Sequence, residues 1–140
     1  MNSLFEIEDN YNFPTSLLLY WGFSWEADED EFFVGKRELL TAGNIPKPIQ
    51  TGFEMMALLK ENRLKVIKAK KDSRFGLIAT KSEKETVLLT YNYEESESEK
   101  ISGNDKIKIE LNGLKKSASY QIKTIILDNE NNNTYQKWIE

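Results

Sequence analysis

The pattern of hydrophobic and polar positions differs between two parts of the chain, residues 1–62 and 63–140. The first part contains a short run, Ser16 to Phe23, in which apolar residues do not alternate with polar ones. A strand that is apolar on both faces is typical of a parallel sheet covered on both sides, although periodicity alone does not distinguish it from a buried helical segment. Trp21 and Gly22 favour the strand, because aromatic residues suit a pleated sheet and glycine weakens a helix interior.

A helical pattern follows Pro46 and Pro48, two prolines that favour an extended chain directly before a helix. Beyond them, apolar side chains recur at helical spacing, which predicts a helix over Ile49 to Glu61. Gly52 lies within this apolar stripe and costs ~1 kcal/mol relative to alanine. We therefore expect Gly52 to mark close packing of the helix against another element.

The second part predicts strands separated by polar turns, beginning with Leu64 to Lys70. Phe75 to Thr80 and Thr86 to Tyr93 are rich in residues that favour strands, and the short polar linker between them predicts a hairpin. The charged segment Glu94 to Asn104 follows as a loop.

Two later segments alternate between apolar and polar residues, Lys106 to Leu111 and Tyr120 to Leu127, with a turn expected at Asn112-Gly113. Thr134 to Ile139 is expected to close the sheet as a last strand. Short strands at this spacing predict a mainly β chain, an antiparallel β-sandwich with one packed α-helix. We expect residues 1–62 and 63–140 to form one compact unit.

Composition excludes several kinds of chemistry. Among the 140 residues, 39% are hydrophobic, cysteine and histidine are absent, and 19 Lys and Arg against 23 Asp and Glu give a net charge of −4. Disulfides, Cys or His metal sites and Ser-His-Asp or Cys-His catalysis are therefore excluded. The negative balance argues against direct contact with nucleic acid, since phosphate contacts need Lys and Arg.

The chain carries no recognisable targeting or membrane segment. Its longest apolar run near the start is far shorter than the ~20 residues of a membrane-spanning helix. Residues 1–10 are acidic and lack the positive and apolar regions of a secretion signal. We expect a cytoplasmic protein with no membrane partner.

Two segments rich in oxygen donors, Glu26 to Glu31 and Asp128 to Asn132, lack the glycine turn and ligand spacing of a calcium loop. We interpret the first as a solvated acidic loop and the second as an asparagine-rich turn, so no metal site and no cofactor site is predicted. The basic stretch between Lys60 and Arg74 is interpreted as protection of a sheet edge against aggregation.

Four aromatic residues of the second part are candidates for a sugar-stacking surface, because aromatic faces suit pyranose rings: Tyr91, Tyr93, Tyr135 and Trp138. Packing in or beside the core is the more usual role of such side chains. Both interpretations stay open at this point.

Four motifs in the same order resemble family 39 glycoside hydrolases, the β-xylosidase-type enzymes. YWGFSW (Tyr20 to Trp25) is similar to the final barrel strand of that family, and the segment Gly43 to Leu59 resembles its IPKP turn and following helix. LLTYNY (Leu88 to Tyr93) resembles a family strand that reads LLYNY, and LDNENNNTYQKW (Leu127 to Trp138) resembles the family ending. The resemblance runs in register from about Ser16 to the C-terminus.

This resemblance implies a (β/α)8 barrel with a β-sandwich beside it, formed by a C-terminal extension. Leu17 to Phe23 would be the eighth barrel strand and Ile49 to Glu61 the eighth helix. The two catalytic glutamates of the family lie on its fourth and seventh strands, upstream of every residue present here, whereas retaining hydrolysis needs two carboxyl groups ~5–5.5 Å apart. The resemblance therefore implies a C-terminal accessory domain without catalytic residues, whose main partner is the remainder of the barrel.

The sequence departs from the family where the sugar pocket would be. Trp25 replaces an aspartate, and Phe32 to Leu40 lacks the pocket histidine and keeps only Gly35 of its glycines. Retained packing motifs with lost polar contacts favour a parent that senses or scaffolds, as in AraC-type transcription regulators that carry such modules. The alternatives are an accessory domain of an active β-xylosidase-type hydrolase, or a carbohydrate-binding module.

Leu17 to Trp21 would lack its parallel neighbours if the barrel is not complete. An apolar strand with an unpaired edge is stabilised when another protein surface covers it. We therefore expect this strand to pack onto the sandwich or onto a second copy, which would make the isolated fragment a homodimer.

Overall fold

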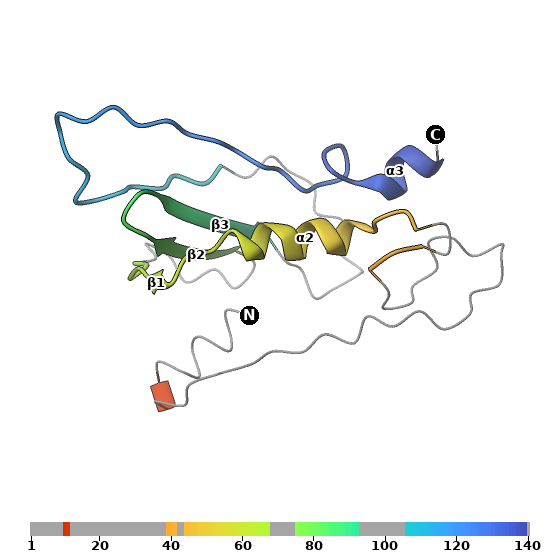
Figure 1. The fold of residues 1–140 in the computed structure, drawn as a ribbon, viewed down its shortest axis with the longest axis horizontal. Coiled ribbons are helices and arrows are strands. Elements are labelled where there is room, and N and C mark those ends of the chain that lie inside the picture. Colours follow the sequence, from red (N-terminus) through yellow and green to blue (C-terminus); the bar gives the residue numbers. More distant parts are fainter. Residues whose placement is uncertain (1–9, 12–38, 42–43, 68–74, 93–105, 140) are drawn as a thin grey trace.

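The structure is a computed structural model that describes residues 10–11, 39–41, 44–67, 75–92 and 106–139. Its elements in chain order are helix α2 (Pro48–Ala57), strands β1 (Asn62–Arg63), β2 (Phe75–Lys81) and β3 (Thr86–Asn92), and helix α3 (Thr134–Ile139) (Figure 1). The expected strand Ser16 to Phe23 and the acidic loop Glu26 to Glu31 lie outside the described residues. Within the described ranges, no helix combines the length and apolar character needed to span a bilayer.

Strands β1, β2 and β3 form one antiparallel sheet with β2 in the centre. β2 and β3 pair along their whole length, from Phe75 opposite Asn92 to Lys81 opposite Thr86. In the loop between them, the amide of Ser82 donates to the carbonyl oxygen of Glu85 at 2.9 Å, and the Ser82 hydroxyl accepts from the Lys84 amide at 3.3 Å. The structure confirms the hairpin predicted from the two strand-like segments and their polar linker.

The most buried side chains lie on the central strand β2, where Ile78, Ala79 and Thr80 are 3%, 6% and 5% exposed. The segment that includes β1 runs along the same end of β2. There the amide of Leu64 donates to the carbonyl oxygen of Ala79 at 2.7 Å. The amide of Lys60 donates to the buried hydroxyl oxygen of Thr80 at 2.9 Å.

The strand predicted over Leu64 to Lys70 is wrong for the part that the structure describes. The residues that pair with β2 are Asn62 and Arg63, whereas residues 64–67 have no strand conformation and residues 68–70 are not described. The pairing begins earlier because Lys60 and Leu64 bond to β2 on either side of β1.

Helix α2 is confirmed, but it ends four residues before the predicted limit at Glu61. Its start follows the expected pattern, since Lys47 is extended (φ −77°, ψ 158°) and Pro48 occupies the first turn. At its end, the amides of Leu58 and Leu59 donate to carbonyl oxygens three residues back, at 3.2 and 3.1 Å. The helix then stops because the next amide, that of Lys60, bonds to Thr80 in the sheet.

Gly52 faces another element, as expected, but the packing there is not tight. A Cβ atom added at Gly52 would have Leu127 Cδ2 as its nearest neighbour at 3.9 Å, an ordinary van der Waals contact. The glycine therefore marks the side of α2 on which Leu127 lies, and there is room for a methyl group.

Residues 106–127 run outward and back as two extended limbs, and we call them the arm (Figure 1). The limbs are joined by a broad end with two bends, one at Gly113 and one where the amide of Ala118 donates to the carbonyl oxygen of Lys115 at 3.2 Å. Gly113 at the turn has φ +83°, a conformation that favours glycine, so the predicted turn at Asn112-Gly113 is confirmed. No residue of the arm is assigned to a strand, in contrast to the expectation for its two limbs. Alternation fixes which side chains share a face, but it does not supply a neighbouring strand.

The last predicted strand, Thr134 to Ile139, is wrong, because these residues form helix α3. The side-chain oxygen of Asn133 accepts a hydrogen bond from the amide of Tyr135 at 3.1 Å, which caps the first turn. The described residues therefore form a mainly β arrangement of three antiparallel strands with helical segments. The β-sandwich remains a prediction.

Candidate functional site

Two of the four candidate sugar-stacking residues meet on helix α3. The ring centroids of Tyr135 and Trp138 are 6.2 Å apart, with 34° between the ring planes. Their side chains are 43% and 50% exposed, so solvent reaches a large part of both rings. The structure thus forms a shallow aromatic surface, which we call the α3 aromatic pair.

The helical conformation is what brings this pair together. Residues three apart lie on one face of a helix, whereas in a strand they would point to opposite faces. The expectation of a strand over Thr134 to Ile139 therefore missed the pairing. The signal that could have revealed it is Asn133, a residue type that favours the position just before a helix.

The turn before α3 is held by its own hydrogen bonds. The carboxylate of Asp128 accepts from the amides of Glu130 and Asn131 at 2.9 and 2.7 Å, and from the Asn131 side chain at 2.9 Å. The side-chain amide of Asn132 donates to the carbonyl oxygen of Ile126 at 2.6 Å, and Asn132 has φ +54°. These contacts confirm the asparagine-rich turn predicted for Asp128 to Asn132.

The same hydrogen bonds change the acidity of Asp128. The side-chain amide of Asn131 stabilises the carboxylate most, followed by the backbone amides of Asn131 and Glu130, and together they lower the pKa of Asp128 below its usual value. Three donors from within the turn are directed at this carboxylate, so its main partner is the turn itself. In the part of the chain that is described, no group of three or more acidic side chains is arranged to hold a metal ion.

Thr134, the first residue of α3, connects the site to the start of helix α2. Its hydroxyl donates a hydrogen bond to the carbonyl oxygen of Pro46, 88 residues earlier in the sequence. Directly before α2, the buried Thr41 organises another turn, in which its hydroxyl accepts from the Ile45 amide at 3.0 Å. The segment that carries the α3 aromatic pair is therefore held by the hydrogen bonds of Asp128, Asn133 and Thr134.

The remaining two candidates do not join this pair. Tyr91 lies on β3 directly opposite Gly76 of β2, and its ring atoms occupy the space in which a side chain at Gly76 would lie. That position supports the packing role for Tyr91, which is half-buried. Tyr93 lies outside the described residues.

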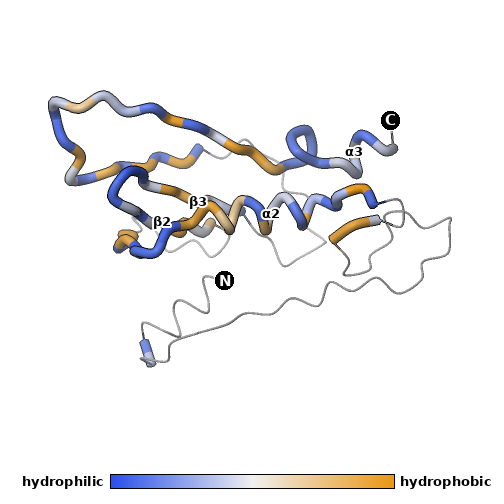
Figure 2. The backbone as a smooth tube through the Cα atoms, in the orientation of Figure 1, coloured by the Kyte–Doolittle hydropathy of each residue, from blue (hydrophilic) through white to orange (hydrophobic). Residues whose placement is uncertain are grey.

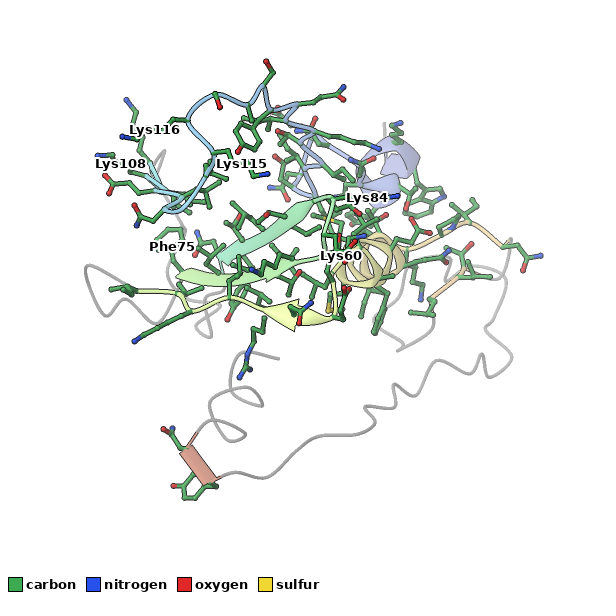
Figure 3. All side chains as sticks on the ribbon, turned by 60° about the vertical axis from the view of Figure 1, so that its left-hand side comes forward. Lys60, Phe75, Lys84, Lys108, Lys115 and Lys116 are labelled. Atoms are coloured by element: carbon green, nitrogen blue, oxygen red, sulfur yellow. The ribbon has the colours of Figure 1, made fainter. Side chains whose placement is uncertain are left out.

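The basic stretch between Lys60 and Arg74 is described only up to residue 67. Arg63 lies on β1 at the edge of the sheet, as the interpretation of edge protection requires. Lys60, which is labelled in Figure 3, has a different role. Its Nζ lies 2.5 Å from Oε1 of Glu85 in the β2–β3 loop.

Comparison with protein families gives a match to the model described as glycosyl hydrolases family 39, over residues 8–140. Comparisons with curated proteins and with solved structures gave no match. The matched residues include α2, the sheet, the arm and α3. Since the match spans nearly the whole sequence, the chain belongs to family 39 of the glycosyl hydrolases.

Proposed function

We propose that this chain is a non-catalytic C-terminal part of a family 39 protein, and that its later segments scaffold helix α2. By the resemblance described above, α2 corresponds to the last helix of the barrel. The function is mechanical, because segments that follow the helix in sequence hold it in position from several sides.

The observation that carries this proposal is that α2 and the residues on either side of it contact three later segments. Two residues before the helix begins, Pro46 accepts the hydrogen bond from Thr134. In its middle, Gly52 faces Leu127 of the arm, and just after its end Lys60 bonds to Thr80 of β2. The helix is thus connected to α3, to the arm and to the sheet.

Hydrogen–deuterium exchange tests the scaffolding. Thr134→Val removes the hydroxyl donor and keeps the size of the side chain, so the amides of residues 52–55, the first in α2 with acceptors within the helix, should exchange about fivefold faster, as expected for loss of ~1 kcal/mol. Thr124→Val is a matched control, because Thr124 is an exposed threonine of the arm. Unchanged exchange in α2 for Thr134→Val would contradict the scaffolding role.

The absence of catalysis needs its own test. Retaining hydrolysis uses an acid and a nucleophile held ~5–5.5 Å apart, and none of the motifs matched in this sequence is one that carries a catalytic glutamate of the family. Incubation of the chain with nitrophenyl β-xyloside should release no nitrophenol above the buffer rate. Release that increases in proportion to protein concentration would overturn the proposal.

For the parent protein, we favour a sensing or scaffolding region of a cytoplasmic AraC-type transcription regulator. The support is the sequence of the pocket segment, where Trp25 replaces an aspartate and Phe32 to Leu40 has no histidine. The alternative is an accessory domain of an active β-xylosidase-type enzyme. Sequence upstream of residue 1 would separate the two, since a helix-turn-helix segment supports the regulator and two glutamates at the ends of barrel strands support the enzyme.

The α3 aromatic pair supports a second candidate function, carbohydrate binding. Titration of the chain with xylo-oligosaccharides should change the tryptophan fluorescence if a sugar stacks on Trp138. Trp138→Ala should abolish the change, whereas Tyr11→Ala removes an exposed aromatic side chain elsewhere and should preserve it. A flat trace for the unmodified chain at millimolar sugar would remove this candidate.

A further inference from the structure

The far end of the arm holds Asn112-Gly113, which is the single Asn-Gly pair of the sequence. Both residues are exposed, and among the residues that the structure describes neither of them forms a hydrogen bond. A Cβ atom added at Gly113 would have no neighbour within 4 Å, so the space beside it is open. In Figure 2 the far end of the arm projects beyond the sheet and is largely hydrophilic. Water therefore reaches this pair, and no contact restrains its backbone.

These are the conditions under which an asparagine reacts with its own backbone. The carboxamide carbon of Asn112 is an electrophile, and the next amide nitrogen, that of Gly113, is a nucleophile that the chain itself holds nearby. A side chain on the following residue would hinder the approach, whereas glycine has none and adopts backbone angles that other residues avoid. Gly113 already has φ +83°. The pair thus combines a nearby nucleophile with a backbone that can reach the reacting geometry.

We propose that Asn112 is a site of spontaneous deamidation. The amide nitrogen of Gly113 loses its proton to solvent and forms a bond to Cγ of Asn112. The bond between Cγ and Nδ2 breaks, and the nitrogen leaves as ammonia, which takes up a proton. Water then opens the resulting succinimide ring at either carbonyl and leaves aspartate or isoaspartate. One water molecule is consumed and one ammonium ion is released, and the neutral carboxamide becomes a carboxylate that is ionised at neutral pH.

The asparagines of the turn before α3 are held in a different way. The side-chain nitrogen of Asn131 donates to the carboxylate of Asp128 at 2.9 Å, and that of Asn132 donates to the carbonyl oxygen of Ile126 at 2.6 Å. Both are also followed by residues that carry a side chain. Their carboxamides must leave these hydrogen bonds before they can react, so we expect the turn to stay intact while Asn112 is converted.

The reaction changes the charge and the backbone of the arm. Residues 106–127 contain five lysines and one glutamate, a net charge of +4, which the new carboxylate lowers to +3. Figure 3 shows Lys108, Lys115 and Lys116 around the far end of the arm, so the negative charge arises in a basic region. In the isoaspartate product the main chain passes through the former side chain, which lengthens the backbone at the bend. The alternation of side chains then changes between the residues before and after the bend.

Incubation of the 140-residue chain at mildly alkaline pH, followed by proteolysis and peptide mass spectrometry, tests the proposal. Peptides that contain residue 112 should gain the mass difference between a carboxyl group and a carboxamide, and an isoaspartyl methyltransferase should methylate the isoaspartate product. A parallel incubation in urea gives the rate for the unfolded chain. Since an exposed turn opens at almost no cost, the rate at Asn112 in the folded chain should lie within about threefold of the rate in urea. Asn131 and Asn132 should react about tenfold more slowly in the folded chain than in urea.

Three variants complete the test. Asn112→Gln should abolish the reaction at this position, because glutamine has to form a larger ring, and Gly113→Ala should slow it several-fold. Asn129→Gln is the matched control, since Asn129 is an exposed asparagine outside the arm, and it should leave the rate at Asn112 unchanged. Circular dichroism should show all three variants folded.

Two results would overturn the proposal. The first is a rate at Asn112 in the folded chain that lies more than about threefold below the rate in urea, because the pair would then be protected by the fold. The second is conversion of Asn131 or Asn132 in the folded chain as fast as that of Asn112, because the hydrogen bonds of the turn would then give no protection.

Discussion

The ring of Tyr91 lies over Gly76 on the neighbouring strand, at the position where any other residue would place its Cβ. The two residues are directly opposite in the β2–β3 register, and an added Cβ at Gly76 would lie 1.8 Å from Cζ of Tyr91. Gly76 is buried beneath this ring. An aromatic residue opposite a glycine fills the gap that the missing side chain leaves in a sheet.

Gly76→Ala should therefore destabilise the hairpin. The methyl group and the ring cannot occupy the same space, so the Tyr91 side chain or the strand must move, at a cost of about 1–3 kcal/mol. Urea unfolding followed by circular dichroism would measure the loss. The double variant Gly76→Ala with Tyr91→Ala should lose less than the sum of the two single variants, and strict additivity would contradict the proposed clash.

Gly52→Ala should have the opposite effect. The nearest atom to the new Cβ would be Leu127 Cδ2 at 3.9 Å, so the methyl group fits without displacement. Alanine in a helix interior is favoured over glycine by about 1 kcal/mol, and the midpoint of urea unfolding should rise accordingly. A lower midpoint would show that α2 approaches the arm more closely than this distance implies.

Local sequence signals predicted the β2–β3 hairpin and helix α2 correctly because each is specified by its own residues. The hairpin needs two strand-forming segments and the polar loop that begins at Ser82, whereas α2 needs Pro48 and an apolar stripe. The end of α2 could not be predicted in this way. It depends on the hydrogen bond between Lys60 and Thr80, a contact between residues 20 apart in sequence.

Helix α3 shows how two local signals can conflict. The strand preference comes from Thr134, Tyr135 and Trp138, which are of types that favour strands. This preference predicts a strand, in which Tyr135 and Trp138 would point to opposite faces. The cap at Asn133 and the bond from Thr134 to Pro46 favour the helix instead. Over six residues, two such contacts outweigh weak intrinsic preferences, and the second of them cannot be seen in the sequence.

The arm shows what the alternation of apolar and polar residues can and cannot predict. Alternation predicts that Ile107 and Ile109 share an apolar face. It could not predict how that face would be covered, because a repeat of two positions says nothing of the neighbouring strand. Both isoleucines remain exposed in the structure, at 52% and 39%.

Thr80→Val tests the junction between α2 and the sheet. The substitution keeps the shape of a side chain that is only 5% exposed, but it removes the acceptor for the Lys60 amide. Leaving a partly buried amide without its partner should cost about 1–3 kcal/mol in the free energy of unfolding. Thr90→Val on β3 is the control, since Thr90 is exposed, and its stability should stay within ~0.5 kcal/mol of the unmodified chain.

The turn before α3 should depend on pH in a defined direction. The pKa of Asp128 is lowered first by the Asn131 side chain and then by the amides of Asn131 and Glu130. A carboxyl group with a lower pKa in the folded state stabilises it at pH values above the unfolded pKa, and this contribution disappears as the pH falls through the folded pKa. The turn should thus be fully stabilised at neutral pH and loosen only below about pH 4.

An NMR titration of the Asp128 carboxyl carbon measures this pKa directly. Asn131→Ala removes the largest stabilising donor and should move the pKa of Asp128 up toward its usual value, while the backbone donors keep part of the shift. Asn129→Ala is the matched control, because this exposed neighbour in the same turn is not among the causes of the shift. If both variants, or neither, raise the pKa of Asp128, the Asn131 side chain does not hold the turn as the geometry indicates.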